Sequence, residues 1–170
     1  MQGRADLGIT AAVKLGVLLV ALTACLALLP AASAPADDRS LRDAGRSRDA
    51  QFERLGDKTR RTYRAWDRAG HTARLARRIL RLNRRTRHEL VLVRTALRGE
   101  QPSSAGGATY KRLMFRSLRA FDVALVWDAR AVRARMRDRI GAALRAARRA
   151  RRHFDRSVRL TNRAIRAIEG

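Results

Sequence analysis

Two long stretches of the chain repeat apolar residues at intervals of three and four, which is the spacing of one face of an α-helix. In residues 51–98 this stripe consists of Phe52, Leu55, Thr59, Thr62, Trp66, Ala69, Ala73, Ala76, Leu80, Leu90, Val93 and Leu97. In residues 109–169 it consists of Met114, Leu118, Phe121, Leu125, Ala129, Val132, Met136, Ile140, Ala143, Ala147, Ala150, Phe154, Val158, Thr161, Ile165 and Ile168. Neither stretch contains proline, so the pattern predicts two long helices in an all-α fold.

Residues 99–108, with the sequence GEQPSSAGGA, separate the two stretches. Glycine, proline and serine in series do not sustain a helix, so this segment is predicted to be a loop. Two apolar stripes joined by a short loop favour a long antiparallel two-helix hairpin of coiled-coil type. Folding about the loop pairs Leu90 with Leu118 and Phe52 with Phe154. Because two helices alone form a thin core, we expect the hairpin to be firmer as a dimer, which forms a four-helix bundle.

Helix ends and weak points follow from five further residues. Gly99 sits where a glycine commonly ends a helix, and Thr109 is the expected N-cap of the second helix. Gly56 and Gly70 each weaken the first helix by up to about 1 kcal/mol relative to alanine. Gly141, expected to lie opposite Trp66, is the weak point of the second helix. The hairpin prediction takes both helices as continuous through these glycines.

Residues 113–127, LMFRSLRAFDVALVW, are apolar on nearly all sides of the predicted helix. A helix with one partner needs only one apolar face. The residues left over are Phe115, Val123, Val126 and Trp127. An exposed patch of this kind indicates a surface for a partner or a membrane. Alternatively the chain covers it by itself, through bending of the helix or through residues 37–50.

An uncharged apolar run, Leu15–Ala32, precedes this helical body. It follows Arg4 and Lys14 and ends in small residues, which is the order of parts in a secretory signal peptide. The better of two A-x-A exits ends at Ala36. Residues 1–36 are therefore predicted to be a signal peptide, and the protein to be exported to the periplasm, the cell envelope or the medium.

Two alternatives remain for the same segment. Leu22-Thr23-Ala24-Cys25 resembles the lipobox of bacterial lipoproteins, which implies acylation of Cys25. An uncleaved inner-membrane anchor is the other alternative, because the run of 18 residues is close to the shortest spanning helix, about 17 residues. The positive-inside rule would then keep the body in the cytoplasm, since the span is followed by Arg39, Arg42, Arg46 and Arg48. The charged residues 37–50 are predicted to be a polar linker.

The chain of 170 residues carries a net charge of +24, and +23 of it falls on residues 37–170. Such a body is expected to bind polyanions. Arginine supplies 36 of the 39 basic residues, and its planar fork suits phosphate through two parallel hydrogen bonds. The candidate polyanion-binding residues are Arg77, Arg78, Arg81, Arg84, Arg85, Arg145, Arg148, Arg149, Arg151 and Arg152. The alternative for any one of them is a solvated helix face, and in the hairpin register the two clusters do not lie opposite each other.

No motif for catalysis, for a cofactor or for a metal ion stands out. His71, His88 and His153 lack a histidine or cysteine at metal-binding helical spacing. Neither a nucleophile triad nor a phosphate-binding glycine loop is present, and nothing indicates sequence-specific nucleic-acid recognition. The sequence therefore predicts a non-enzymatic, exported or membrane-tethered basic helical protein that binds anionic envelope polymers, an anionic membrane surface or client proteins. The alternatives are an oligomerisation or interaction module that uses residues 113–127, and a membrane-anchored, non-specific nucleic-acid binder.

Overall fold

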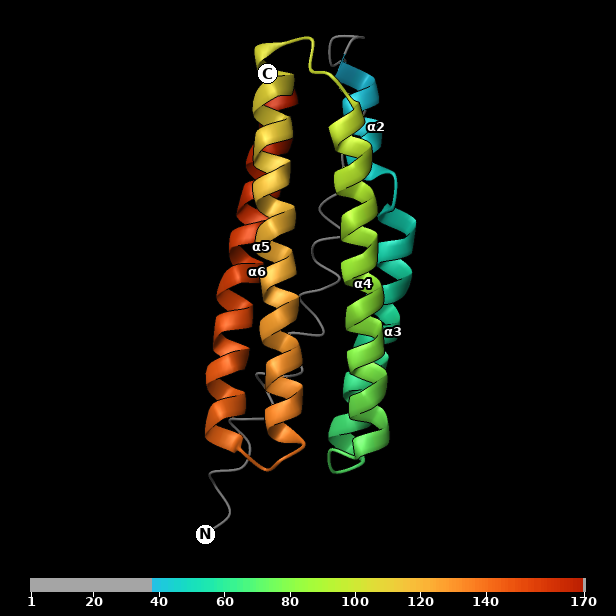
Figure 1. Cartoon of the computed structure of the whole chain (residues 1–170), viewed down its shortest axis with the longest axis vertical. Helices are drawn as coiled ribbons and strands as arrows, with labels where there is room; N and C mark the ends of the chain where they lie inside the picture. The colour runs from blue at the N-terminus through green and yellow to red at the C-terminus, as the bar shows by residue number, and fades with distance from the viewer. Residues whose placement is uncertain (1–37, 170) are drawn as a thin grey trace.

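The computed structural model describes residues 38–169, which form one short helix and four long helices in chain order (Figure 1). These helices are α2 (Arg39–Arg46), α3 (Asp49–Arg68), α4 (Ala73–Gly99), α5 (Ala105–Arg135) and α6 (Ile140–Glu169). The described residues contain no strand, so the predicted all-α class is confirmed.

The predicted leader lies outside the described residues, together with Cys25 and the exit at Ala36. Within the described part of the chain, no helix is both long enough and apolar enough to cross a membrane. The segment predicted as a polar linker contains α2, which buries Leu41 and Ala44 against α4 and α5.

The first predicted helix, residues 51–98, is divided into α3 and α4 by a tight turn. Gly70 and His71 both adopt left-handed backbone conformations, with φ of 64° and 68°. The His71 N–H then donates to the carbonyl oxygen of Trp66 at 2.8 Å, which closes the end of α3. The continuous helix expected here is therefore wrong, because Gly70 reverses the chain instead of weakening a helix that passes through it.

The second predicted helix, residues 109–169, is likewise divided into α5 and α6. Asp138 has φ of 52°, and the N–H of the next residue, Arg139, donates to the Ala134 carbonyl oxygen at 3.0 Å. Met136 and Ile140, which the apolar stripe predicts to be buried, are 37% and 53% exposed at this turn. The expected continuous helix is wrong here too. The break falls just before Gly141, at an aspartate that tolerates the left-handed region.

Each half of the chain thus folds back on itself, and the helices lie side by side as two hairpins (Figure 1). The closest packing is between α5 and α6, while α4 packs against both α3 and α5. Both tight turns lie at the same end, at the bottom of Figure 1, and the loop from α4 to α5 lies at the other end. Four long helices therefore come together within one chain, and a dimer is not needed to supply them.

Two apolar clusters form the core. In the larger one, Phe121 of α5 lies between Phe52 of α3 and Phe154 of α6, with ring centroids 6.4 and 5.7 Å apart. The smaller cluster, near the tight turns, consists of Tyr63, Trp66, Ala76, Ile79 and Val132. Trp66 packs there and not opposite Gly141, which is exposed. Between α4 and α5, the contact of Asn83 with Leu125 is close to the register predicted for the hairpin.

The other end of the bundle is fixed by Asp38. Its carboxylate accepts hydrogen bonds from the Ser103 N–H at 3.0 Å and from the hydroxyl groups of Ser103 and Ser104. The hydrogen bond from Ser104 is the main cause that lowers the pKa of Asp38. Ser104 also accepts from the Gly107 N–H at 2.9 Å, so Ser104, and not Thr109, is the N-cap of α5.

Candidate functional site

A cleft of about 290 Å³ lies between α4 and α5. Its arginines are Arg77, Arg81, Arg84 and Arg87 of α4 and Arg133 of α5. The remaining lining residues are Leu80, Asn83, Leu125, Val126 and Ala129. We call this feature the α4–α5 cleft. Steps of three and four residues bring each set of side chains to one face of its helix, so the cleft follows directly from the two helical patterns.

The α4–α5 cleft is strongly positive because none of its described lining residues is acidic. Only Arg87 has an ion pair with a described residue: its Nε donates to Asp122 Oδ1 at 2.7 Å. The hydrogen bond to Asp122 raises the pKa of Arg87 and fixes its guanidinium group at the edge of the cleft. All five arginines are exposed. An anion in the cleft would therefore meet several guanidinium groups that are free to turn toward it.

A buried polar network supports the cleft from below. Asn83 Nδ2 donates to the Leu125 carbonyl oxygen at 2.9 Å and to Asp128 Oδ2 at 3.1 Å. The Tyr63 hydroxyl donates to the same carboxylate at 2.7 Å. Burial raises the pKa of Asp128 to about 6, against the opposing effect of these two donors. The network joins α3, α4 and α5 and so holds the two walls of the cleft in register.

The outward face of α4 extends the cleft in both directions. Arg81 also lines a neighbouring surface hollow, together with Thr72, Arg74, Leu75 and Arg78. Arg84 also lines a second hollow, together with Gln51, Arg85, His88 and Glu89. Because each hollow shares an arginine with the cleft, the three form a continuous basic track along α4. From Arg74 to His88 this track is about 21 Å long at 1.5 Å per residue.

Half of the ten arginines singled out in the sequence lie on this track. Arg77, Arg81 and Arg84 line the cleft itself, and Arg78 and Arg85 line its neighbours. The α6 cluster lies apart from the track. There, a shallow hollow is lined by Arg145, Arg148, Arg151, Arg152 and Asp155. Arg74 and Arg87, at the two ends of the arginine-rich run 74–87, are not among the ten candidates, although helical spacing could have added them. Arg133 joins the cleft only through tertiary packing.

The four residues of the predicted partner surface are all half-buried. Phe115 packs against the larger core cluster, and Val126 lines the α4–α5 cleft. Trp127 is in contact with two guanidinium groups, those of Arg130 at 4.4 Å and Arg149 at 4.6 Å from the ring centroid. The close packing of α6 on α5 supplies, within the chain, the second partner that residues 113–127 require.

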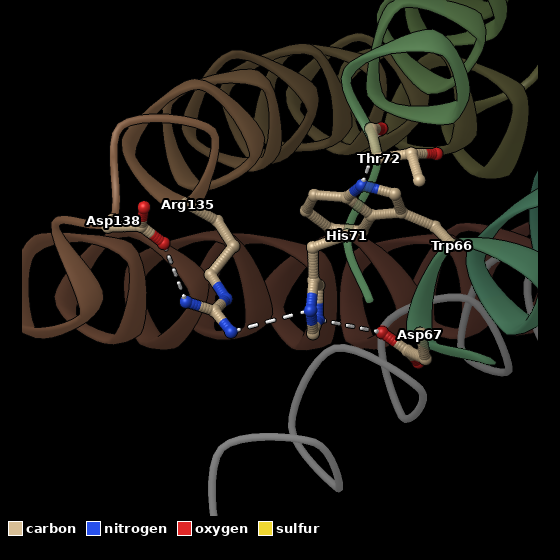
Figure 2. A network of polar contacts seen from close by, with 6 residues as sticks. All are labelled: Trp66, Asp67, His71, Thr72, Arg135 and Asp138. Atoms are coloured by element: carbon tan, nitrogen blue, oxygen red, sulfur yellow. Dashed lines mark hydrogen bonds and ion pairs between the residues drawn. The ribbon is translucent and has the colours of Figure 1, made fainter. Parts of the chain in front are cut away.

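A second polar network joins the two tight turns at the end of the bundle (Figure 2). Arg135 lies between Asp138 and His71, with Nη1–Oδ1 and Nη2–Nδ1 distances of 3.4 and 3.3 Å. His71 Nε2 lies 3.4 Å from Asp67 Oδ1 on its other side. Burial raises the pKa of Asp67, and His71 opposes the shift. The indole of Trp66 donates to the Thr72 carbonyl oxygen at 3.1 Å.

The contacts of this network fix the two turns relative to each other. Its histidine is enclosed by a guanidinium group on one side and by a carboxylate on the other, as Figure 2 shows. In residues 38–169 no group of three or more histidine, cysteine, aspartate or glutamate side chains is arranged to hold a metal ion.

No protein-family model, no curated protein and no solved structure matches this chain. The chemistry of the α4–α5 cleft is therefore judged from its own residues.

Proposed function

We propose that the protein is a non-enzymatic, exported or membrane-tethered helical protein that binds anionic, phosphate-bearing polymers of the cell envelope through the basic track on α4. The observation that carries this proposal is the continuity of the track, since Arg81 and Arg84 each belong to two adjoining hollows. A linear polyanion can follow such a row of guanidinium groups, and each group can hold a phosphate in a bidentate manner.

Charge distribution within the track supports binding of anions over a solvated helix face. Where a helix face is merely solvated, acidic residues usually alternate with the basic ones. The acidic residue among the lining residues of this track is Glu89, which pairs with Arg48 at 2.7 Å, and Asp122, beside the cleft, pairs with Arg87. Arg77, Arg81 and Arg84 have no ion pair with any described residue, and their repulsion is relieved when an anion binds.

Binding of inorganic polyphosphate tests this proposal. The full chain should bind it with an affinity that falls steeply with salt, because bound counterions are released. Replacing Arg77, Arg81 and Arg84 together by glutamine should lower the affinity at least tenfold and reduce the salt slope by about one per lost contact.

The matched control replaces Arg61, Arg64 and Arg68 by glutamine. These three residues are exposed on α3, outside the cleft, and their loss changes the net charge by the same amount. The control should keep most of the affinity. Equal losses in the two triple variants would mean that only net charge matters, and a lack of binding at low salt would exclude the function itself.

A further inference from the structure

We propose that the ligand of the α4–α5 cleft is a phosphate-bearing amphiphile, such as an anionic lipid or the lipid-linked end of an envelope polymer. Its headgroup is held by the arginines, and the first carbons of its acyl chain lie on the apolar floor. This inference rests on the proposed function and narrows it to one class of anion.

Apolar side chains lie directly among the arginines of the cleft. Leu80, Leu125, Val126 and Ala129 line the cleft together with the five guanidinium groups. A fully hydrated polyanion gains nothing from contact with aliphatic side chains, because its own surface is polar. A ligand that carries a phosphate next to a hydrocarbon segment satisfies both parts of the cleft at once.

The apolar floor of the cleft is already formed in the protein alone. Leu125 is only 3% exposed, and Leu80 packs against the cluster that contains Tyr63 and Trp66. Asn83 is held by its two hydrogen bonds to α5. Because this floor does not have to reorganise, binding of an apolar segment carries little free-energy cost for ordering the site.

A second arginine cluster in the same chain lacks such a floor. The hollow on α6 is lined by Arg145, Arg148, Arg151 and Arg152, and Asp155 is its fifth lining residue. Its density of arginines is similar, but none of its described lining residues is apolar. Aliphatic side chains therefore do not accompany every arginine cluster of this protein: the α4–α5 cleft has four, the neighbouring hollow on α4 has one, Leu75, and the α6 hollow has none.

Size limits how much of the ligand can enter. The volume of about 290 Å³ is close to the lower end of small-molecule sites, which is about 300 Å³. This space accommodates a phosphate and the adjoining few carbons, and the rest of an acyl chain stays outside. Such a fit suits a lipid that remains in a membrane or a micelle while its headgroup is bound.

The experiment compares three soluble probes with the full chain by titration calorimetry. They are dihexanoyl phosphatidic acid below its micelle concentration, glycerol 3-phosphate and dihexanoyl phosphatidylcholine. Each buried methylene strengthens binding about fourfold. Phosphatidic acid should therefore bind at least tenfold more tightly than glycerol 3-phosphate. Phosphatidylcholine, whose headgroup has no net charge, should bind more weakly than phosphatidic acid.

Val126→Ser tests the floor without changing the charge. Val126 is half-buried, so the variant should fold, and circular dichroism checks that it does. The preference for phosphatidic acid over glycerol 3-phosphate should fall about fourfold or more. Ala129→Ser is the second floor variant, for the case that Val126→Ser does not fold, and Arg148→Gln on α6 should leave the preference intact.

Two results separate the inference from the proposed function. If the wild-type chain binds polyphosphate but shows no preference for phosphatidic acid, the inferred amphiphilic ligand is wrong and the proposed function stands. The same conclusion follows if a folded floor variant keeps that preference. If the wild-type chain binds neither polyphosphate nor phosphatidic acid at low salt, both fail.

Discussion

At the scale of single residues, Asp128 is the most consequential side chain, because its carboxylate is buried beneath the candidate cleft. It is 6% exposed and accepts hydrogen bonds from Tyr63 and Asn83, with no basic partner in this network. Burial raises its pKa from 3.8 to about 6. The native state therefore binds the Asp128 proton more tightly than the unfolded chain does. The resulting stabilisation is complete below about pH 3.8 and is lost as the pH rises through about 6.

Asp128→Asn should remove this pH dependence, because the amide imitates the protonated carboxyl group. We expect the variant to exceed the wild type in free energy of unfolding by about 1–3 kcal/mol at pH 7.5, since each pKa unit corresponds to about 1.4 kcal/mol. At pH 4 the two proteins should be nearly equal. Urea unfolding at both pH values measures the difference. A constant difference at both pH values would show that Asp128 is not the group that titrates.

At the scale of the elements, the periodicity of the sequence predicted which residues are helical but not where the helices turn. Helix propensity predicts only that Gly70 weakens a helix, whereas in the structure Gly70 begins a reversal that also places His71 in the left-handed region. Asp138 gave no signal, because Met136 and Ile140 continue the apolar stripe across the second turn. Apolar residues recur at the same spacing whether one helix continues or the chain turns and a second helix keeps the same repeat.

The residues of the candidate site could likewise be predicted from the sequence only in part. The arginine-rich run 74–87 made Arg77, Arg81 and Arg84 candidates for binding an anion, and all three line the α4–α5 cleft. Arg133 and Val126 joined them only through the packing of α5 on α4, which a single sequence does not specify. The apolar segment 113–127 has no second partner in a two-helix hairpin, whereas in the structure α6 is a separate helix that folds back on α5 and packs against this segment.

The turn between α5 and α6 offers a test of its backbone strain. Asp138 has φ of 52°, and its side chain is 93% exposed, so the backbone conformation is the main constraint on this position. Glycine adopts the left-handed region without steric cost, whereas alanine does not. Asp138→Gly should therefore be more stable than Asp138→Ala by about 1 kcal/mol.

Denaturant unfolding of the two variants measures this difference. Both lose the exposed contact with Arg135, so that contact cancels in the comparison. If the alanine variant equals or exceeds the glycine variant in stability, the left-handed turn at Asp138 is not what divides α5 from α6.

At the scale of the whole molecule, three ties hold the two hairpins together along their length. Near the middle, Phe121 joins Phe52 to Phe154. Closer to the tight turns, the Asp128 carboxylate joins α3 and α4 to α5. At the end of the bundle, Arg135 bridges the two turns through His71 (Figure 2). The basic track lies on α4, the helix that packs against both α3 and α5, so binding there acts on the seam between the hairpins.

If the protein is exported as proposed, the first residue of the mature chain can be predicted. Cleavage after Ala36 would remove the apolar run and would leave Asp37 as the first residue. Asp38 and the helices that follow it would stay in place, because the Asp38 carboxylate is bound to Ser103 and Ser104. The mature protein would then keep its basic track and meet envelope polymers outside the cytoplasm.

Intact-mass measurement of the protein purified from its native host decides among three outcomes. A chain that begins at Asp37 is the expected result. A chain that begins at an acylated Cys25 would keep twelve residues, 25–36, as a tether and would hold the track close to a lipid surface. A chain that retains Met1 would contradict export, and the arginines from Arg39 to Arg48 would then favour an anchored protein whose track faces the cytoplasm. The measurement thus determines which phosphate-bearing molecules the α4–α5 cleft can reach.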